Sequence, residues 1–417
     1  MQKNCARKDR EDFKSVDRNL FLHDLAIVAI LKNEGHYIKE WLDYHLLAGV
    51  NHFYLYDNDS TDNYNEIIAP YVSAGLVTNR IISGKSAQFA AYDDAVLNYR
   101  FYCRYMAFVD LDEFIYPKTN RSVVEIVDEI LLQDLNASGV SINWQLFGSN
   151  GEDKADYSRG VLERFTRRAP VDWVVPIPHR TIPGGNAQVK TIANPRRIYF
   201  FTSAHFPIYF EENYSINEVG SVVPNYCNEP VTAEKIALNH YNVKSREEFF
   251  IKVNKGRADK ATNYFTADWF DMYDRNEVFD DGILKYRAAR AEKIYLEDEP
   301  HCRARLKDAL IKNLSAEKFS LETALTCRAA ANYLQEKFLE EASLGAILES
   351  LNGMNLADVR LLISELPNLL ILPYPAVKYL REVSIQIISQ TMNFMRENEF
   401  WKDFADLDQL RRLLKIF

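Results

Sequence analysis

The 417-residue chain has few cysteines, and none of the five stands in a C-x-x-C or cysteine–histidine spacing: Cys5, Cys103, Cys227, Cys302 and Cys327. This scarcity argues against a disulfide framework or a structural zinc site, and it indicates free thiols in a reducing compartment. No apolar run approaches the roughly 18 residues that span a bilayer, and residues 1–20 lack the apolar core of a signal peptide. We therefore expect a cytoplasmic protein without a transmembrane segment; peripheral contact with a membrane stays open.

An excess of basic residues is absent as well. With 50 Lys and Arg against 59 Asp and Glu, the formal net charge is −9, which argues against a general nucleic-acid-binding protein. The chain is otherwise composed like a globular protein, with 47% hydrophobic and 26% charged residues, and it is longer than a typical single domain. The aromatic content of 13% suits a carbohydrate-facing groove.

The hydrophobic pattern begins with one strand–helix–strand unit. Apolar runs predict buried parallel strands over 25–31 and 53–56, and apolar residues at three- and four-residue spacing over 37–45 predict a helix that Gly49 ends. This order is a βαβ unit, which is typical of α/β folds. The same criteria predict helices over 64–72, 86–101 and 124–131 (the last capped by Ser122) and strands over 77–82, 106–109 and 140–144.

The second half of the chain divides into two kinds of sequence. Residues 153–239 are rich in prolines and aromatics and predict irregular structure with short strands between turns, such as 197–201, and a helical pattern returns at Ser245. From about residue 298 the pattern is almost wholly helical. We expect a polar N-terminal extension over 1–20, an α/β domain over 21–297 and a helical domain over 298–417.

The predicted strand 106–109 delivers two carboxylates, Asp110 and Asp112, one residue apart. In an extended chain, residues i and i+2 project to the same side, here at the carboxyl edge where open α/β sheets bind ligands. A divalent cation such as Mg²⁺ or Mn²⁺ relieves the repulsion and keeps coordination positions open for substrate phosphates. The alternative interpretation is an acidic strand end that is solvated or paired with lysines.

Two other phosphate-handling classes fit the sequence less well. Phosphatases with an aspartate nucleophile require Thr or Val two residues after the second aspartate, where this chain has Phe114. Nucleotidyltransferases usually carry a glycine-rich loop after the first strand, and Lys32-Asn-Glu-Gly35 is not such a loop.

Several ordered motifs resemble those of the glycosyltransferase group related to families 2 and 92. The opening resemblance lies in Lys32-Asn-Glu, Tyr37-Ile-x-Glu-Trp-Leu-x-Tyr-His45 and Gly49-Val-x-x-Phe-Tyr-Leu-Tyr-Asp-Asn58. The later motifs are Phe108-Val-Asp-Leu-Asp-Glu-Phe114, Trp144-x-x-Phe-Gly-Ser149 and Asn239-His-Tyr-x-x-Lys-Ser245. The resemblance covers about residues 24–285 and leaves the helical C-terminal part outside. It implies a Rossmann-like GT-A fold over 21–297, a nucleotide-diphospho-sugar donor and a divalent cation, usually Mn²⁺.

The resemblance also suggests roles for further polar residues. It implies that His240 is a third metal ligand beside Asp110 and Asp112, and that Lys244 contacts the diphosphate; alternatively these are a packed histidine and an ordinary surface lysine. Four polar residues that follow the first two strands are candidates for binding the base and ribose: Asn33, Glu34, Asp57 and Asn58. The alternative is that they only form turns, because Asn and Asp favour turns on their own account.

Donor and acceptor contacts complete the predicted site. Gln88 and Tyr92 lie one turn apart on the helix before the aspartates and are candidates for facing the donor, although core packing explains Tyr92 equally well. Trp144 is a candidate for stacking on a sugar ring, with simple burial as the alternative. An inverting transferase needs a general base; the candidates are Glu152 and Asp153, favoured by the preceding glycine-bearing loop, with Glu163 and Asp172.

Together these observations predict a metal-dependent glycosyltransferase that moves a sugar from a UDP-sugar to a saccharide acceptor with inversion, as in cell-surface polysaccharide or glycan synthesis. The alternative is a non-catalytic sugar- or partner-binding protein on a decayed transferase scaffold. The helical domain is left with three candidate roles: oligomerisation, membrane contact or acceptor recognition. The oligomeric state, donor sugar and linkage stay open.

Overall fold

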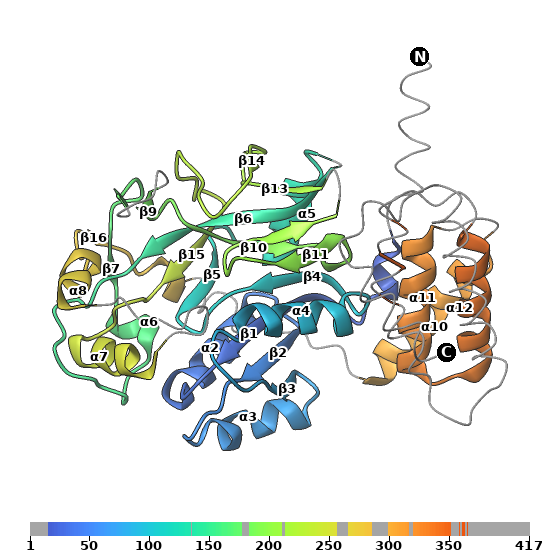
Figure 1. The fold of residues 1–417 in the computed structure, drawn as a ribbon, viewed down its shortest axis with the longest axis horizontal. Helices are drawn as coiled ribbons and strands as arrows, with labels where there is room; N and C mark the ends of the chain where they lie inside the picture. Colours follow the sequence, from blue (N-terminus) through green and yellow to red (C-terminus); the bar gives the residue numbers. More distant parts are fainter. Residues whose placement is uncertain are drawn as a thin grey trace, which may run out of the picture. The chain divides into compact units, whose positions relative to one another are not determined.

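The computed structural model describes residues 16–134, 136–176, 183–210, 213–256, 266–285, 299–316 and 320–351, with the single residues 358, 361, 362 and 365 (Figure 1). The chain divides into two compact units. The larger consists of His23–Val96 and Tyr105–Leu296; the smaller combines Met1–Leu22, Leu97–Arg104 and Glu297–Phe417. Most of the predicted N-terminal extension lies outside the described residues.

A mixed ten-stranded sheet forms the centre of the larger unit, and its main path runs β14–β13–β6–β10–β4–β1–β2–β3, with β15 pairing with both β6 and β5. Neighbours β1, β2 and β3 are parallel, whereas β10 is antiparallel to β4 and β6. The strands are β1 (His23–Leu31), β2 (His52–Asp57), β3 (Val77–Ile81), β4 (Cys103–Phe108), β5 (Glu113–Pro117), β6 (Ala137–Leu146), β10 (Val189–Ala193), β13 (Tyr214–Ile216), β14 (Val222–Val223) and β15 (Ile236–His240).

Helices and short ribbons complete this unit. The helices are α2 (Gly35–Leu47), α3 (Tyr64–Ser73), α4 (Gln88–Tyr99), α5 (Val123–Leu131), α6 (Val161–Arg164), α7 (Arg246–Lys255), α8 (Ala267–Tyr273) and the 3₁₀ turn η2 (Pro195–Arg197). The two-stranded ribbons pair β11 (Ile198–Phe201) with β12 (Pro207–Tyr209), β7 (Arg167–Arg168) with β16 (Val278–Phe279), and β8 (Val174–Val175) with β9 (Gly184–Gly185). Ser122 caps α5 and Ser245 caps α7, each in a capping box.

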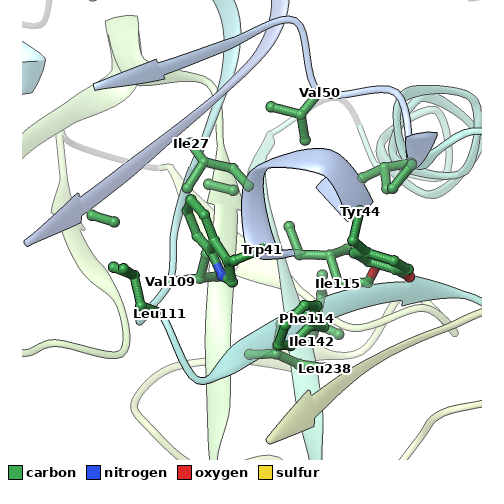
Figure 2. Close-up of a cluster of buried hydrophobic side chains, with 14 of the residues drawn as sticks. Ile27, Trp41, Tyr44, Val50, Val109, Leu111, Phe114, Ile115, Ile142 and Leu238 are labelled. Atoms are coloured by element: carbon green, nitrogen blue, oxygen red, sulfur yellow. The ribbon is translucent and has the colours of Figure 1, made fainter. Parts of the chain in front are cut away.

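The hydrophobic core lies between the sheet and helices α2, α3 and α5. Successive strand residues point to opposite faces, and alternate residues of β1 join this cluster: Leu25, Ile27, Ala29 and Leu31. Figure 2 shows Trp41 and Tyr44 of α2 among side chains that come from several strands and from the loop after β4. The other side of β4 packs differently, because Phe108 contacts Tyr92 of α4 and Phe201 of β11.

The predicted α/β fold class with a parallel core is confirmed, and most predicted elements occur within a few residues of their expected bounds. The principal difference lies in 153–239, which was expected to be irregular with short strands; the expected strand over 197–201 occurs as β11. This region supplies β10, a fully buried strand between β4 and β6, and β15, which pairs with β5 and β6. β10 was missed because Lys190 interrupts a five-residue strand that is otherwise only weakly apolar.

The smaller unit is helical, as predicted. Its described elements are η1 (Arg18–Leu20), α10 (Glu299–Leu314), α11 (Leu321–Leu334) and α12 (Lys337–Ser350), and Leu20, Leu306 and Leu310 contribute to its own apolar core. Helical sequence predicted further towards the C-terminus lies largely outside the described residues. None of the helices in the described ranges has the length and apolar character needed to cross a membrane. The four cysteines that the structure describes form no disulfide, and Cys5 lies outside the described residues.

Candidate active site

The two aspartates lie on the connection between β4 and β5. Strand β4 ends at Phe108, and the amide of Glu113 donates a 3.0 Å hydrogen bond to the carbonyl oxygen of Asp110 across a turn. The expectation that Asp110 and Asp112 share one side of an extended strand is therefore wrong. The chain turns here because Glu113 begins a new strand, which pairs with β15 rather than with β4. The two carboxylates accordingly meet different partners.

Helix α2 holds β5 through three hydrogen bonds. The indole Nε1 of Trp41 donates to the carbonyl oxygen of Glu113 at 2.8 Å, and the Tyr44 hydroxyl donates to that of Ile115 at 2.8 Å. The amide of Ile115 donates to Nε2 of His45 at 3.2 Å. These contacts give the Trp-Leu-x-Tyr-His part of the α2 motif a physical role, because they fix the strand that follows the aspartates.

Asp110 is held by an amide and a buried ammonium. Gln88 Nε2 donates to Asp110 Oδ1 at 2.9 Å, and Lys190 Nζ donates to Asp110 Oδ2 at 2.9 Å. The Lys190 side chain is only 2% exposed, and its ammonium also lies 3.4 Å from Glu113 Oε2. Burial alone would lower the pKa of Lys190, but Asp110 and Glu113 raise it above its ordinary value. Gln88 thus contacts a proposed metal ligand, and its expected contact with the donor stays a prediction; Tyr92 is buried in the core.

Glu113 is a fully buried carboxyl beside this pair. Its Oε2 accepts a 2.8 Å hydrogen bond from the amide of Asp110, and its Oε1 has no hydrogen-bond partner among the described residues. Burial raises the pKa of Glu113 to about 8; Lys190 opposes this rise, and the charges of Asp110 and Asp112 add to it.

Asp112 is countered by a second lysine. Lys252 Nζ, on the last turn of α7, donates to Asp112 Oδ2 at 2.5 Å, and it also donates to Asn242 Oδ1 at 2.8 Å and to the Asn242 carbonyl at 3.2 Å. Burial by itself would raise the pKa of Asp112, but the neighbouring ammonium of Lys252 helps to hold it well below its usual value. The lysine pairing that the alternative interpretation requires is therefore present at both aspartates.

His240 stands next to Asp112 at the end of β15. Its Nε2 lies 3.6 Å from Asp112 Oδ1, and its buried Nδ1 has no hydrogen-bond partner among the described residues. Burial lowers the pKa of His240, which favours the neutral form that a metal ligand needs. Within the described part of the chain, no three His, Cys, Asp or Glu side chains converge as a preformed metal cluster. Trp144 packs 4.3 Å from the His240 ring and is only 7% exposed, so its indole lies within the fold.

Lys244 is a buried cation that has no acidic partner within the described ranges. Its ammonium lies 4.6 Å from the centre of the Tyr37 ring, and among the described residues it makes no ion pair or hydrogen bond. Burial lowers the pKa of Lys244, and the nearby charge of Asp112 opposes that shift. Its φ of 53° is uncommon for a residue other than glycine, and such backbone conformations occur often at ligand sites.

The four predicted nucleotide residues lie at the carboxyl ends of β1 and β2. The two asparagines hydrogen-bond to neighbouring loops. Asn33 Oδ1 accepts a hydrogen bond from the amide of Thr61 at 2.7 Å, and Asn58 Nδ2 donates to the carbonyl oxygens of Ile82 and Gly84. Asp57 is buried, and its Oδ1 accepts from the amide of Ser60 at 2.9 Å. Glu34 forms an ion pair with Lys255 of α7. Turn chemistry thus accounts for much of what the two asparagines do.

The two favoured base candidates differ in their surroundings. Arg164 Nε donates to Glu152 Oε2 at 2.9 Å, and Arg159 also pairs with Glu152. Asp153 is exposed, and its side chain makes no ion pair or hydrogen bond with the described residues. The carbonyl oxygen of Asp153 accepts from the amide of Glu247 at 3.0 Å, which places this residue beside the first turn of α7.

A buried ion pair fixes α7. The guanidinium of Arg164 donates to both carboxylate oxygens of Glu248, at 3.0 and 2.7 Å, and both side chains are 1% exposed. Glu248 also accepts from the Tyr37 hydroxyl at 2.9 Å and completes the capping box with Ser245. This arrangement anchors the start of α7, whose last turn carries Lys252.

Sequence reasoning missed four residues of this site: Lys190, Asn242, Lys252 and Lys255. A lysine inside a strand-like segment was the available signal for Lys190, because a buried lysine requires a partner. Lys252 and Lys255 lie three residues apart on one predicted helix, a spacing that places both on one face. Asn242 carried no signal of its own.

Comparison with known proteins matches this region to one family. The model of glycosyltransferase family 92 matches residues 28–277. A glycosyltransferase family 92 protein of Ricinus communis is 27% identical over 173 residues, which cover 41% of this chain and 30% of that protein. The galactan β-1,4-galactosyltransferase GALS2 of Arabidopsis thaliana is 31% identical over 100 residues, covering 22% of this chain and 19% of that protein. The chain thus spans less than a third of the length of these two relatives.

Among solved structures, the chain is similar to residues 1–349 of TarS from S. aureus. The two are 14% identical, and the alignment covers 90% of this chain and 92% of that chain with a TM-score of 0.27.

Proposed function

This chain belongs to glycosyltransferase family 92, and we propose that it transfers a sugar from a nucleotide-diphospho-sugar, with UDP-sugar as the preferred donor class, to a saccharide acceptor. We further propose that transfer uses a divalent cation and inverts the anomeric centre. The leaving group is then a nucleoside diphosphate, whose growing negative charge must be stabilised.

The observation that carries this proposal is the buried ammonium of Lys244. A buried charge without a hydrogen-bonded counter-ion costs free energy, and an anionic ligand would remove that cost. Lys244 lies within electrostatic range of Asp112, a carboxylate suited to a cation. A cation ligand and an anion receptor therefore lie close together, as binding of a metal–diphosphate complex requires.

The residues between β4 and β5 suit a divalent cation that binds together with the diphosphate of the donor. Asp110 and Asp112 supply carboxylate oxygens, and Mg²⁺ or Mn²⁺ commonly takes only one or two protein carboxylates and completes its coordination with substrate phosphates. His240 is the proposed third protein ligand: its Nε2 lies beside Asp112, and its Nδ1 has no hydrogen-bond partner in the described part of the chain. When bound, the cation would supply Lewis-acid stabilisation of the leaving diphosphate.

The remaining proposed roles are nucleotide binding and general-base catalysis. We assign the nucleotide to the carboxyl ends of β1 and β2, where Asp57 and Glu34 present carboxylates near loops shaped by Asn33 and Asn58. The proposed base, Asp153 or Glu152, would accept the acceptor hydroxyl's proton. Two arginines occupy the Glu152 carboxylate, so the surroundings favour Asp153.

A second candidate function is supported by the lysine pairing. Lys190 and Lys252 already neutralise the two aspartates, as they would in a sugar- or partner-binding protein that has lost turnover. Hydrolysis of UDP-sugars in water in the presence of Mn²⁺ separates the two functions, because a non-catalytic scaffold leaves the donor intact.

The test is calorimetric titration of UDP and GDP, each with Mn²⁺ and with EDTA. We expect UDP binding that disappears in EDTA. Preferential GDP binding would keep the transferase and change the donor class. Binding of neither nucleotide would favour the non-catalytic scaffold.

A further inference from the structure

The two lysines that neutralise the aspartates differ in their freedom to move. Lys190 projects from a central strand, is 2% exposed and contacts Asp110 and Glu113 together. Lys252 projects from the last turn of α7, and its side chain is 29% exposed. If the Lys190 ammonium moved away, two carboxylates would lose their cation inside the fold. The partly exposed Lys252, at a helix end, can change its rotamer and turn its ammonium towards water.

The ammonium of Lys252 sits among three oxygen atoms. These are Asp112 Oδ2 at 2.5 Å, Asn242 Oδ1 at 2.8 Å and the Asn242 carbonyl oxygen at 3.2 Å. One carboxylate, one amide oxygen and one backbone carbonyl make up a set of hard oxygen ligands of the kind that divalent cations select. The three donors of a lysine ammonium satisfy the same three acceptors. The three oxygen atoms around Lys252 Nζ could therefore bind a divalent cation in place of the ammonium.

Two further lysines belong to this region. Lys244, which lies over the Tyr37 ring, is within electrostatic range of Lys252, and Lys255, three residues on in α7, pairs with Glu34. An ammonium that is displaced from Asp112 would stay close to the turn, because its helix is anchored by the Arg164–Glu248 pair. A diphosphate bound beside Asp112 would then offer it a new anionic partner.

We propose that Lys252 is an exchangeable counter-ion, which yields the oxygen site of Asp112 and Asn242 to the divalent cation of the donor complex and then pairs with the donor diphosphate. The exchange of ammonium for metal rests only on the oxygen set, whereas the pairing with diphosphate rests on the proposed function. Each anion keeps a cationic partner in this exchange, because the divalent cation replaces the ammonium at the Asp112 carboxylate and the ammonium then pairs with the diphosphate.

The test combines two variants with opposite expected effects. Lys252→Met removes the competing ammonium, so Mn²⁺ without nucleotide should bind about three- to fivefold more tightly, while UDP with Mn²⁺ should bind about tenfold more weakly. Asn242→Ala removes an oxygen ligand, so Mn²⁺ alone should bind more weakly. Calorimetry with Mn²⁺, with UDP plus Mn²⁺ and with uridine measures these effects, and uridine affinity should not change in Lys252→Met.

Lys39→Met is the matched control. Lys39 also forms a lysine–aspartate pair, 2.6 Å from Asp43, but its side chain is 67% exposed on α2. It should leave every affinity unchanged. Should Lys252→Met fail to fold, Lys252→Gln keeps a hydrogen-bond donor for Asp112 without the charge, and the same directions are expected.

The outcomes separate the two proposals. Unchanged or weaker binding of Mn²⁺ alone in Lys252→Met overturns the exchange. UDP affinity in Lys252→Met equal to that of the wild type overturns the pairing with diphosphate and leaves the transferase proposal intact. Wild-type protein that binds no nucleoside diphosphate with Mn²⁺ overturns the proposed function, and the Mn²⁺ titrations still decide the exchange.

Discussion

The indole Nε1 of Trp41 lies 2.8 Å from the carbonyl oxygen of Glu113, the residue directly after the second aspartate, and both side chains are fully buried. This hydrogen bond ties helix α2 to the strand that begins where the proposed cation site ends. It explains why a tryptophan, rather than another large apolar residue, suits this position of the helix.

Replacing Trp41 with phenylalanine should lower the free energy of unfolding by about 1–3 kcal/mol beyond any packing loss, because the Glu113 carbonyl loses its indole donor in a dry environment. Urea unfolding measures the change. Tyr71→Phe is the control: its hydroxyl bonds to the partly exposed Asp43, which water can solvate, so the cost should stay below about 1 kcal/mol. A Trp41→Phe protein as stable as the wild type would contradict the assignment.

His45 should make stability depend on pH. Its Nδ1 lies 2.8 Å from the Trp41 carbonyl and its Nε2 accepts from the amide of Ile115, which together require the neutral ring. Burial lowers the pKa of His45 to about 3. Because the folded pKa lies below the unfolded value of 6.5, this stabilisation is complete above pH 6.5 and is lost as the pH falls towards 3.

The check is urea unfolding between pH 7 and pH 5 for the wild type and His45→Gln. Across this range the wild type should lose about 1–2 kcal/mol more than the variant. His52, which burial holds at a pKa of about 4, is present in both proteins and cancels from the comparison. Parallel pH profiles would show that His45 does not carry the effect.

Removing only one partner of the Arg164–Glu248 pair should strongly lower the free energy of unfolding. Arg164→Met leaves Glu248 buried without its cation and should destabilise the fold by about 3–5 kcal/mol. The double variant with Glu248→Met should cost less than the sum of the two single changes. Arg159→Met is the control, since that side chain is 51% exposed, and it should change stability by no more than about 0.5 kcal/mol. Additive costs would argue against direct coupling.

Asp110→Asn should abolish Mn²⁺-dependent UDP binding while the protein stays folded. The amide has nearly the same shape, but it lacks the charge that a cation needs, and Lys190 keeps Glu113 as an acidic partner. Calorimetry with UDP and Mn²⁺, together with a thermal melt, tests this outcome. Asp156→Asn, at a partly exposed loop carboxylate, serves as the control. Undiminished Mn²⁺-dependent affinity in Asp110→Asn would remove Asp110 from the cation site.

Asp153→Asn should reduce sugar transfer by a factor of about 10² or more with unchanged UDP affinity, as expected for loss of a general base. Glu152→Gln should instead lower stability, because its carboxylate pairs with the largely buried Arg164. Transfer assays and UDP titrations on both variants separate these effects. Full transfer by both, and by the amide variants of Glu163 and Asp172, would eliminate the base from this set.

Local patterns predicted what depends on local sequence. Buried parallel strands are nearly continuous apolar runs, so β1 and β2 could be located to within a few residues, and Ser122 and Ser245 marked the starts of α5 and α7. The turn at Asp110–Asp112 was not predicted, and an extended chain was expected there, because an apolar run shows that a strand exists but not how the chain continues after it. β10 was missed, since its burial comes from neighbours that are distant in sequence.

The sequence by itself determined the order of the α/β elements, the pair of aspartates and the motifs that matched the family. Only the tertiary structure decided which cations meet those aspartates. Lys190 is 80 residues from Asp110, and Lys252 is 140 residues from Asp112. Sheet order places β10 beside β4, and the buried Arg164–Glu248 pair sets the position of α7. Such pairings depend on the packing of distant segments, and no local periodicity records them.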